Sequence, residues 1–273
     1  MPHGLNLHRH RERLKIWREG WIVGRSAVRG SGWFCGAVRR VGRVALLLCC
    51  LGVMADISSA EEIANRTTIV VFGDSQGAGL ARGLQRILIE DQRFRVLNRT
   101  HAGAALVHAE NEWFGAIQNF VGHEKADIAV AMFGANDRLD FKDESGTTLR
   151  FRTEEWRAAY AARIDQLLKA MTGAGLKVIW CGNPIARSDT YSTDMSYINE
   201  IYAAEAAKFG AQFMPLWNAV ADRDGHYAAF GKDRDGVTQR MRADDGIHFT
   251  APGYELIAGR VLELIPPPPT NMP

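Results

Sequence analysis

Two patterns of hydrophobic positions alternate along the chain. Short apolar segments rich in β-branched residues are typical of strands that are buried on both faces, as in a parallel sheet. Segments in which apolar residues recur every three or four positions are typical of helices packed on one side. The strand-like segments cover residues 69–72, 94–98, 126–133, 176–181 and 211–216. The helical patterns cover residues 80–88, 110–120, 154–171, 194–202 and 254–265. This alternation predicts an α/β fold, in which a five-stranded parallel sheet carries helices on both faces.

Two polar stretches interrupt the alternation. Residues 142–152 contain glycine and mostly polar side chains, which predicts a surface loop. Residues 221–246 form the longest irregular piece and contain Asp-Arg-Asp-Gly twice, at 222–225 and 233–236. The spacing of the acids is compatible with calcium, but each copy is too short for the full binding loop. Turn formation by the aspartates is therefore the favoured interpretation.

The first strand-like segment ends in a sharp corner at Gly73-Asp74-Ser75, after which the first helical pattern begins. Such a corner places Ser75 at the carboxyl end of a central strand, beside N–H groups of a helix N-terminus. Open α/β sheets bind their ligands at this place. A simple cap for the helix is the alternative role for Ser75.

The glycines around Ser75 match three other motifs only in part. Gly73-x-Ser75-x-Gly77 fits the nucleophile elbow of α/β-hydrolases, but that fold needs several strands before its nucleophile. Gly73-x-x-x-Gly77-x-Gly79 resembles the cofactor loop of short-chain dehydrogenases, but no tyrosine of the chain has a lysine four residues on. A phosphate-binding loop would need Gly-Lys-Ser/Thr, which is absent. The role of the corner therefore depends on residues further along the chain.

A second polar motif, Asp245-Gly-Ile-His248, precedes the last helical pattern, for which Thr250 is the expected cap. An aspartate three residues before a histidine can accept a hydrogen bond from one imidazole nitrogen. The other nitrogen is then free to take a proton from a serine, as in a Ser–His–Asp triad. The motif thus makes Ser75 a candidate nucleophile.

Four motifs in a fixed order resemble the SGNH (GDSL-type) hydrolase superfamily. They are Gly73-Asp74-Ser75, the loop glycine Gly103, Gly134-x-Asn136-Asp137 and Asp245-x-x-His248, within residues 67–265. The resemblance implies a flavodoxin-like three-layer α/β/α sandwich and hydrolysis of an ester without a cofactor or a metal.

The same resemblance assigns a role to each motif residue. Ser75 is the implied nucleophile, His248 the base and Asp245 the residue that orients it. The implied oxyanion hole consists of the Ser75 amide, the Gly103 amide and the Asn136 side chain. Asp74 and Asp137 are expected to hold loops rather than to touch substrate. The residues themselves agree with this chemistry, because pre-aimed donors stabilise a developing oxyanion without a metal.

Charge and composition separate an N-terminal extension from the rest of the chain. Residues 1–60 carry 10 Lys and Arg against 3 Asp and Glu, whereas residues 61–273 carry 23 against 28. A mildly acidic body argues against nucleic acid as a partner. Arginines before the apolar residues 44–55, followed by small residues up to Ala60, predict a signal peptide at 1–60 and cleavage after Ala60. An uncleaved membrane anchor formed by residues 44–55 is the alternative.

The expected mature chain, residues 61–273, is a single hydrolase domain in an exported, periplasmic protein. It keeps one cysteine, Cys181, which lies in a strand-like segment and is expected to be a buried small hydrophobe. The expected substrate is an ester of a small molecule or of a glycan, such as an O-acetyl group of the cell envelope. The only expected membrane contact is through the signal segment. An O-acyltransferase with the same site and a non-catalytic polysaccharide-binding protein are the alternatives.

Overall fold

The computed structural model describes residues 66–108 and 112–267. The predicted signal segment, residues 44–55, and the predicted cleavage after Ala60 lie outside the described residues. Within the part that is described, none of the helices has the length and apolar character needed to cross a membrane.

A five-stranded parallel sheet forms the centre of the fold, in the order β2-β1-β3-β6-β7. Its strands are β1 (Thr67–Gly73), β2 (Phe94–Thr100), β3 (Ile128–Met132), β6 (Lys177–Cys181) and β7 (Gln212–Met214). All five coincide with the strand-like segments of the sequence, so the predicted sheet is confirmed. Strand β1 lies between β2 and β3, because the chain first builds outward to β2 and then returns to the other side of β1. Ligands of open α/β sheets bind at such a reversal of strand order, and Ser75 follows β1 at this point.

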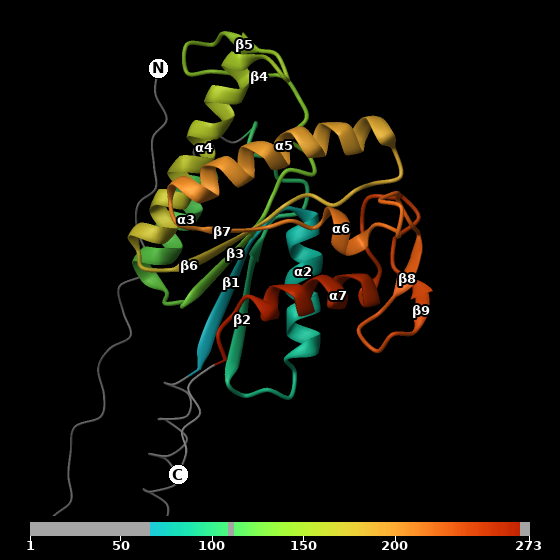
Figure 1. Ribbon diagram of the computed structural model, residues 1–273. Coiled ribbons are helices and arrows are strands. Elements are labelled where there is room, and N and C mark those ends of the chain that lie inside the picture. Colours follow the sequence, from blue (N-terminus) through green and yellow to red (C-terminus); the bar gives the residue numbers. More distant parts are fainter. Residues whose placement is uncertain (1–65, 109–111, 268–273) are drawn as a thin grey trace, which may run out of the picture. The chain divides into compact units, whose positions relative to one another are not determined.

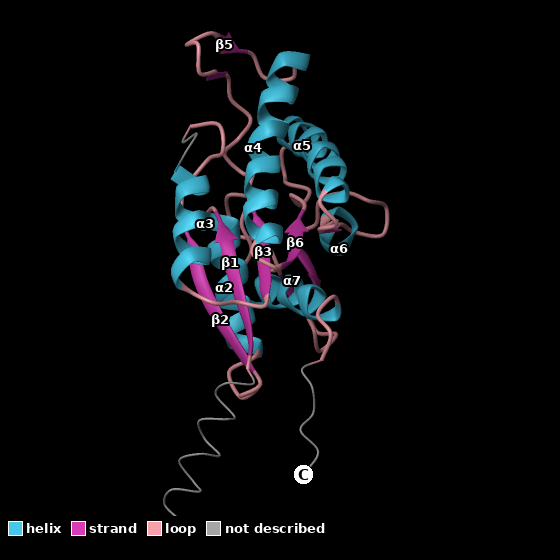
Figure 2. Ribbon diagram, turned by 90° about the vertical axis from the view of Figure 1, so that its left-hand side faces the viewer, coloured by secondary structure: helices cyan, strands magenta, loops and turns pink. Residues whose placement is uncertain are grey.

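Helices cover both faces of the sheet (Figures 1 and 2). One face carries α2 (Ser75–Ile87) and α7 (Ala251–Glu263), which pack against each other. The other face carries α3 (Glu112–His123), α4 (Glu154–Gly173) and α5 (Asp189–Lys208). This arrangement is the predicted three-layer α/β/α sandwich.

The buried strands contribute side chains to two separate hydrophobic cores, one on each face of the sheet. Ile69 and Val71 of β1 contribute to the core under α2 and α7, whereas Val70 and Phe72 contribute to the core under α3, α4 and α5. Successive side chains of a strand point to opposite faces, which explains this alternation. A continuous apolar run was therefore the correct signal for a strand buried on both sides.

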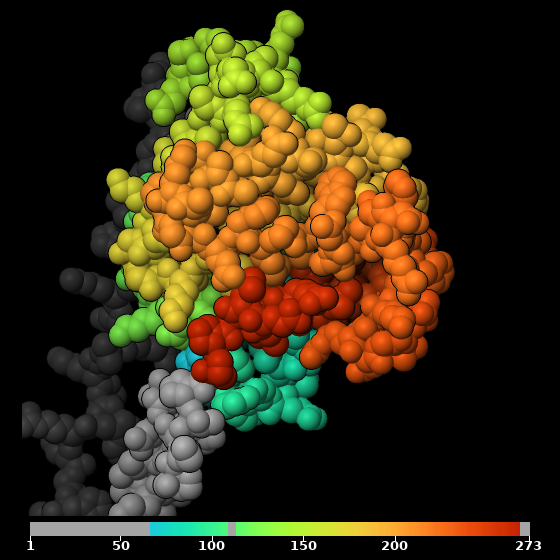
Figure 3. Space-filling view, viewed as in Figure 1, coloured from blue at the N-terminus to red at the C-terminus, as the bar shows by residue number. Residues whose placement is uncertain are grey.

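Irregular segments at the carboxyl edge contain more structure than the sequence predicts. Two-stranded antiparallel pairs form from β4 (Phe141–Lys142) with β5 (Thr148–Leu149) and from β8 (Phe230–Lys232) with β9 (Thr238–Arg240). A short helix, α6 (Trp217–Val220), follows β7. In Figure 3 the segment with β8 and β9 lies against the end of α7 where that helix begins, and both line a common hollow.

Helix starts were the least accurate part of the prediction. Helix α5 begins at Asp189 rather than Asp194, because the Ser188 side chain accepts a hydrogen bond from the Tyr191 amide and caps the helix earlier. Thr153 caps α4, because its hydroxyl accepts a hydrogen bond from the Trp156 amide. Thr250 stands at the N-cap position of α7, but its hydroxyl donates to the Arg240 carbonyl instead of capping the helix.

Candidate active site

The corner after β1, residues 73–76, is called the serine corner below. Gly73 has a φ of +154°, and a Cβ at this position would lie 2.1 Å from the Met132 carbonyl oxygen. Glycine is required because its lack of a side chain allows β1 and β3 to approach this closely. Asp74, not Ser75, caps α2: its Oδ1 accepts from the Gln76 amide at 2.8 Å. The role of a simple cap for Ser75 is therefore wrong, and the hydroxyl is available for other contacts.

Residues 242–249, called the histidine loop below, lead into α7 on the same face of the sheet as α2. The loop closes on itself, because the Ala243 amide donates to the His248 carbonyl at 2.9 Å. Asp245 Oδ1 accepts from the amides of Ile247 and His248, at 2.8 and 2.9 Å. These bonds form a tight turn that presents the His248 side chain outward from the loop.

The structure brings Ser75, His248 and Asp245 into one hydrogen-bonded chain. Ser75 Oγ lies 2.7 Å from His248 Nε2, and His248 Nδ1 lies 2.6 Å from Asp245 Oδ2. An ionised carboxylate can only accept hydrogen bonds, so Nδ1 carries the ring proton of the neutral imidazole. Nε2 is then an acceptor for the Ser75 hydroxyl proton. This arrangement can deprotonate the serine as it attacks a carbonyl carbon.

Asp245, within this hydrogen-bonded chain, and Asp74, next to Ser75, have pKa values shifted in opposite directions. Burial alone would raise the pKa of Asp245, but hydrogen bonds from the His248 ring and from two backbone amides lower it to about 2. Asp245 is therefore charged at neutral pH and keeps the imidazole tautomer fixed. Burial raises the pKa of Asp74 to about 7, in spite of its backbone hydrogen bonds. Asp74 Oδ2 also accepts from the Ala135 amide at 3.0 Å, so this side chain joins two loops.

The loops after β2 and β3 bring the other two candidate residues to the same edge. Asn136 Nδ2 donates to the Ala104 carbonyl at 2.9 Å, which holds Asn136 against the loop that contains Gly103. Gly103 is exposed and has a φ of +79°, and the amide of its neighbour Ala104 donates to His101. The His101 amide donates to the Gly73 carbonyl at 2.8 Å, so this loop lies beside the serine corner.

Asp137 is fully buried beneath these loops. It accepts from the Val107 amide at 3.2 Å and from the Tyr160 hydroxyl at 2.7 Å, and Tyr160 in turn contacts the Tyr202 hydroxyl. Burial raises the pKa of Asp137 to about 6, although these donors act in the opposite direction. Asp74 and Asp137 thus hold loops, as expected from the sequence.

Sequence reasoning missed three buried polar residues near the site. Gln76, Arg242 and Tyr254 are 2%, 0% and 6% exposed, and the first two donate to the Ile247 carbonyl in the histidine loop. The one available signal was the position of Gln76 directly after Ser75. The contacts of Gln76 with Ile247 and with Tyr254 join residues 171 and 178 positions apart, which no local pattern reveals, whereas Arg242 bonds within its own loop.

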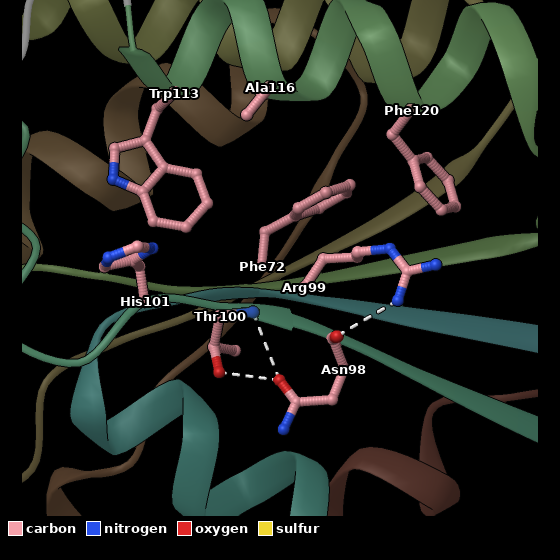
Figure 4. A pocket seen from close by; sticks show the side chains of 8 residues that line it. All are labelled: Phe72, Asn98, Arg99, Thr100, His101, Trp113, Ala116 and Phe120. Atoms are coloured by element: carbon pink, nitrogen blue, oxygen red, sulfur yellow. Dashed lines mark hydrogen bonds between the residues drawn. The ribbon is translucent and has the colours of Figure 1, made fainter.

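A hollow of about 310 Å³ lies beside the site, between the edge strand β2 and helix α3. Figure 4 shows the side chains of Phe72, Trp113 and Phe120 in the space between the helix and the sheet. Its polar wall is formed by Asn98, Arg99, Thr100 and His101. The His101 amide donates to the Gly73 carbonyl, so this wall adjoins the serine corner. Ser75, Asp245 and His248 do not line this hollow, so it is separate from the hydrogen-bonded chain.

The repeated Asp-Arg-Asp-Gly motifs form turns, as the favoured interpretation predicted. Asp222 Oδ1 accepts from the amides of Asp224 and His226, and Asp233 Oδ1 accepts from those of Asp235 and Val237. In the portion of the chain that the structure describes, His, Cys, Asp and Glu side chains form no group of three that could hold a metal ion. Cys181 is buried in β6, and burial raises the pKa of its thiol.

Known proteins provide an independent comparison. Residues 68–264 match the family described as "Protein of unknown function (DUF459)", whereas no curated protein matches the chain by sequence. The solved structure of TesA is 20% identical, with a TM-score of 0.51, and the match covers 74% of this chain and 99% of that chain.

Two further solved structures have the same fold. A catalytic mutant of Axe2, an acetylxylan esterase from Geobacillus stearothermophilus, is 15% identical, with a TM-score of 0.50 and coverage of 72% and 93% of the two chains. LAE5, an alpha/beta hydrolase enzyme from the metagenome of Lake Arreo, Spain, is 19% identical, with a TM-score of 0.51 and coverage of 72% and 94%. The family match spans more than half of the sequence, so this chain belongs to the DUF459 family, and its fold is that of the SGNH hydrolases.

Proposed function

We propose that this protein is a serine esterase or acylhydrolase that cleaves an ester through an acyl-serine intermediate. The observation that carries the proposal is the hydrogen-bonded chain from Ser75 through His248 to Asp245, with distances of 2.7 and 2.6 Å. A serine that only capped a helix would not need a histidine base oriented by a carboxylate.

The reaction follows from the proton positions in this chain. Ser75 Oγ attacks the ester carbonyl carbon while its proton passes to His248 Nε2. The C–O bond to the alcohol then breaks, and the imidazolium returns the proton to the leaving oxygen. Water attacks the acyl-serine in the second half, again losing a proton to His248, and the acid leaves as Ser75 recovers its proton. Asp245 remains ionised throughout and stabilises the imidazolium.

The proposed oxyanion hole consists of the amides of Ser75 and Gly103 and the side chain of Asn136. Helix α2 begins at Ser75, and the first N–H groups of a helix have no intrahelical acceptor. Asn136 Nδ2 carries two hydrogens, of which the bond to Ala104 uses one. The other remains for the negative oxygen of the tetrahedral intermediate.

An O-acetyl ester on a cell-envelope glycan is the proposed substrate, and the protein is proposed to act outside the cytoplasm after export. The order of basic, apolar and small residues at 39–60 supports export, and a fold neighbour is an acetylxylan esterase. N-terminal sequencing of the exported protein tests the cleavage after Ala60, and a mature chain that keeps residues 44–55 would favour the anchor instead.

The first test compares the wild type with Ser75→Ala and Asn136→Ala on p-nitrophenyl acetate and on acetylated glycans. Ser75→Ala should lose turnover and labelling by a fluorophosphonate while it keeps its fold. Asn136→Ala removes a donor that matters most in the transition state, so kcat should fall about 100- to 1000-fold with a smaller change in KM.

A folded wild type that neither labels nor cleaves any ester, yet binds glycan as well as both variants do, would contradict the proposal. The non-catalytic binding protein would then be the correct interpretation. Adding an alcohol or glycan acceptor to the assay separates hydrolysis from acyl transfer, because a transferase forms a new ester in place of free acid.

A further inference from the structure

A side-chain amide connects the serine corner directly to the histidine loop. Gln76 follows Ser75, and its Nε2 donates at 2.8 Å to the carbonyl of Ile247, the residue before His248. Ser75 and His248 are thus hydrogen-bonded to each other, and so are their sequence neighbours Gln76 and Ile247. This second bond joins the same two segments as the first.

The peptide group between Ile247 and His248 is held at both of its edges. Its carbonyl oxygen accepts from Gln76 Nε2 and, at 3.0 Å, from Arg242 Nη2. Its N–H group donates to Asp245 Oδ1 at 2.9 Å. Because a peptide group is planar and rigid, fixing both edges fixes the orientation of the bond that enters His248.

The Gln76 amide is itself fixed in one orientation. The Ile247 carbonyl can only accept, so the NH₂ group of Gln76 must face it, and Oε1 then accepts from the Tyr254 hydroxyl at 3.0 Å. Tyr254 belongs to α7, which lies against α2 (Figure 1). A Cβ at Gly79 of α2 would be 1.9 Å from Tyr254 Cζ, so the Tyr254 ring packs closely on α2 beside Gln76. Gln76 is 2% exposed, and this burial strengthens the need for both partners.

Arg242 holds the other side of the same carbonyl. Its guanidinium is fully buried and lies 4.1 Å from the centre of the Phe249 ring and 4.9 Å from that of Tyr227. Arg242 and Phe249 also pair through the backbone at the base of the histidine loop. Arg242 is thus part of the loop's own packing, whereas Gln76 provides the contact from outside the loop.

We infer that Gln76 is a positioning residue, which sets the distance and angle between His248 Nε2 and Ser75 Oγ through the Ile247 carbonyl. The expected effect on catalysis rests on the proposed function, whereas the effect of Gln76 on the position of His248 does not. Gln76 acts through His248 and is placed away from the reacting atoms. A leucine, the residue that the motif name GDSL has at this position, could not make this contact.

The test uses Gln76→Met, which keeps the length of the side chain and removes its donors. Its matched control is Gln85→Met, the same substitution at an exposed position of the same helix. Crystal structures of the wild type and both variants give the Ser75 Oγ to His248 Nε2 distance. Steady-state kinetics on p-nitrophenyl acetate give kcat and KM, and thermal unfolding verifies the fold.

Gln76→Met should break the Ser75–His248 hydrogen bond and lower kcat about 100-fold with KM nearly unchanged, because small displacements of a base have effects of this size. Gln85→Met should leave both quantities unchanged. A residue with a merely structural role would change the unfolding temperature without this split between kcat and KM. The inference is overturned if Gln76→Met keeps the hydrogen bond and a kcat within about twofold of the wild type.

Failure of the proposed function gives a different result. If the folded wild type neither cleaves esters nor labels with a fluorophosphonate, the esterase proposal is wrong, and the crystallographic distance alone decides the positioning role. If Gln76→Met does not fold, Tyr254→Phe replaces it, because this change removes only the hydroxyl that orients the Gln76 amide. An unchanged distance and kcat in Tyr254→Phe would then overturn the inference.

Discussion

The serine corner and the histidine loop meet at one hydrogen bond but are held in place in different ways. Ser75 is positioned by backbone: β1 pairs with strands on both sides, and α2 begins at Ser75 itself. His248 lies in an irregular loop, whose Ile247 carbonyl is fixed by the side chains of Gln76 and Arg242. The comparison indicates that regular elements place the proposed nucleophile, whereas a few buried side chains place its proposed base.

The carboxylates of the two regions differ as well. Asp74 in the serine corner is fully buried, and its pKa is raised to about 7 by burial. The side chain of Asp245 in the histidine loop is 46% exposed, and its pKa is lowered to about 2 by hydrogen bonds that outweigh the effect of burial. The carboxylate that must be charged in the proposed mechanism is thus Asp245, which water and hydrogen-bond donors stabilise.

The largest expected effect comes from Asp245→Asn in the histidine loop. The amide can no longer stabilise the imidazolium or fix the required tautomer, so kcat should fall about 10⁴-fold at neutral pH. Asp244→Asn is the matched control, because Asp244 is the exposed neighbour and its side chain forms a surface ion pair with Arg240. Initial rates on p-nitrophenyl acetate measure both.

A kcat of Asp245→Asn within about tenfold of the wild type would contradict this role of the carboxylate. Equal losses in Asp244→Asn would instead show that the loop tolerates no change of charge. Either result would remove the chemical difference between the two regions on which the comparison depends.

An intermediate effect is expected in the pH dependence of stability, with opposite signs for the two carboxylates. The pKa of Asp74 rises from 3.8 in the unfolded chain to about 7 in the folded protein. The folded state then holds the proton longer, so the free energy of unfolding falls by on the order of 4 kcal/mol as the pH rises from about 4 to about 7. The lowered pKa of Asp245 has the opposite effect, and its contribution is lost as the pH falls from about 4 to about 2.

Urea unfolding between pH 3 and pH 8 measures these slopes. Asp74→Asn should flatten the decline toward neutral pH, and Asp245→Asn should flatten only the decline below about pH 4. Identical pH profiles of the wild type and Asp74→Asn would show that the pKa of Asp74 is the same in the folded and the unfolded protein. The contrast between the two carboxylates would then be wrong.

The two regions also differ in how far the sequence predicts them. The serine corner is local: an apolar strand, three motif residues and a helix follow each other, so the fold and Ser75 could be read from neighbours in the chain. The Asp245–His248 bond is equally local, three residues apart. Ser75, Asp245 and His248 were therefore named from the sequence, and the structure places them together.

The contacts that position the histidine loop could not be read in this way. The bond from Gln76 to Ile247 spans 171 residues, and it lies beside the close packing of α7 on α2. Such packing depends on the glycine at position 79, whose role is visible only when the Tyr254 ring is seen against it. The start of α5 was mislocated because Ser188 and Asp194 are both good caps: Ser188 caps the helix, whereas the Asp194 side chain pairs with Arg138 and Arg152.

The smallest expected effect concerns this helix contact and is tested by one substitution at two positions. Gly79→Ala would place a Cβ 1.9 Å from Tyr254 Cζ, so the Tyr254 ring must move away from α2, at a cost of about 1–3 kcal/mol in the free energy of unfolding. Gly115→Ala in α3 is the control: a Cβ there meets no atom within 4 Å. It should stabilise the protein by about 0.5–1 kcal/mol, because alanine favours the helix. Displacement of the Tyr254 ring also withdraws its hydroxyl from Gln76, so Gly79→Ala should lower kcat as well, while Gly115→Ala should not. A destabilised Gly79→Ala variant with unchanged kcat would mean that the histidine loop keeps its position without α7, and that the two regions are more independent than their shared contacts indicate.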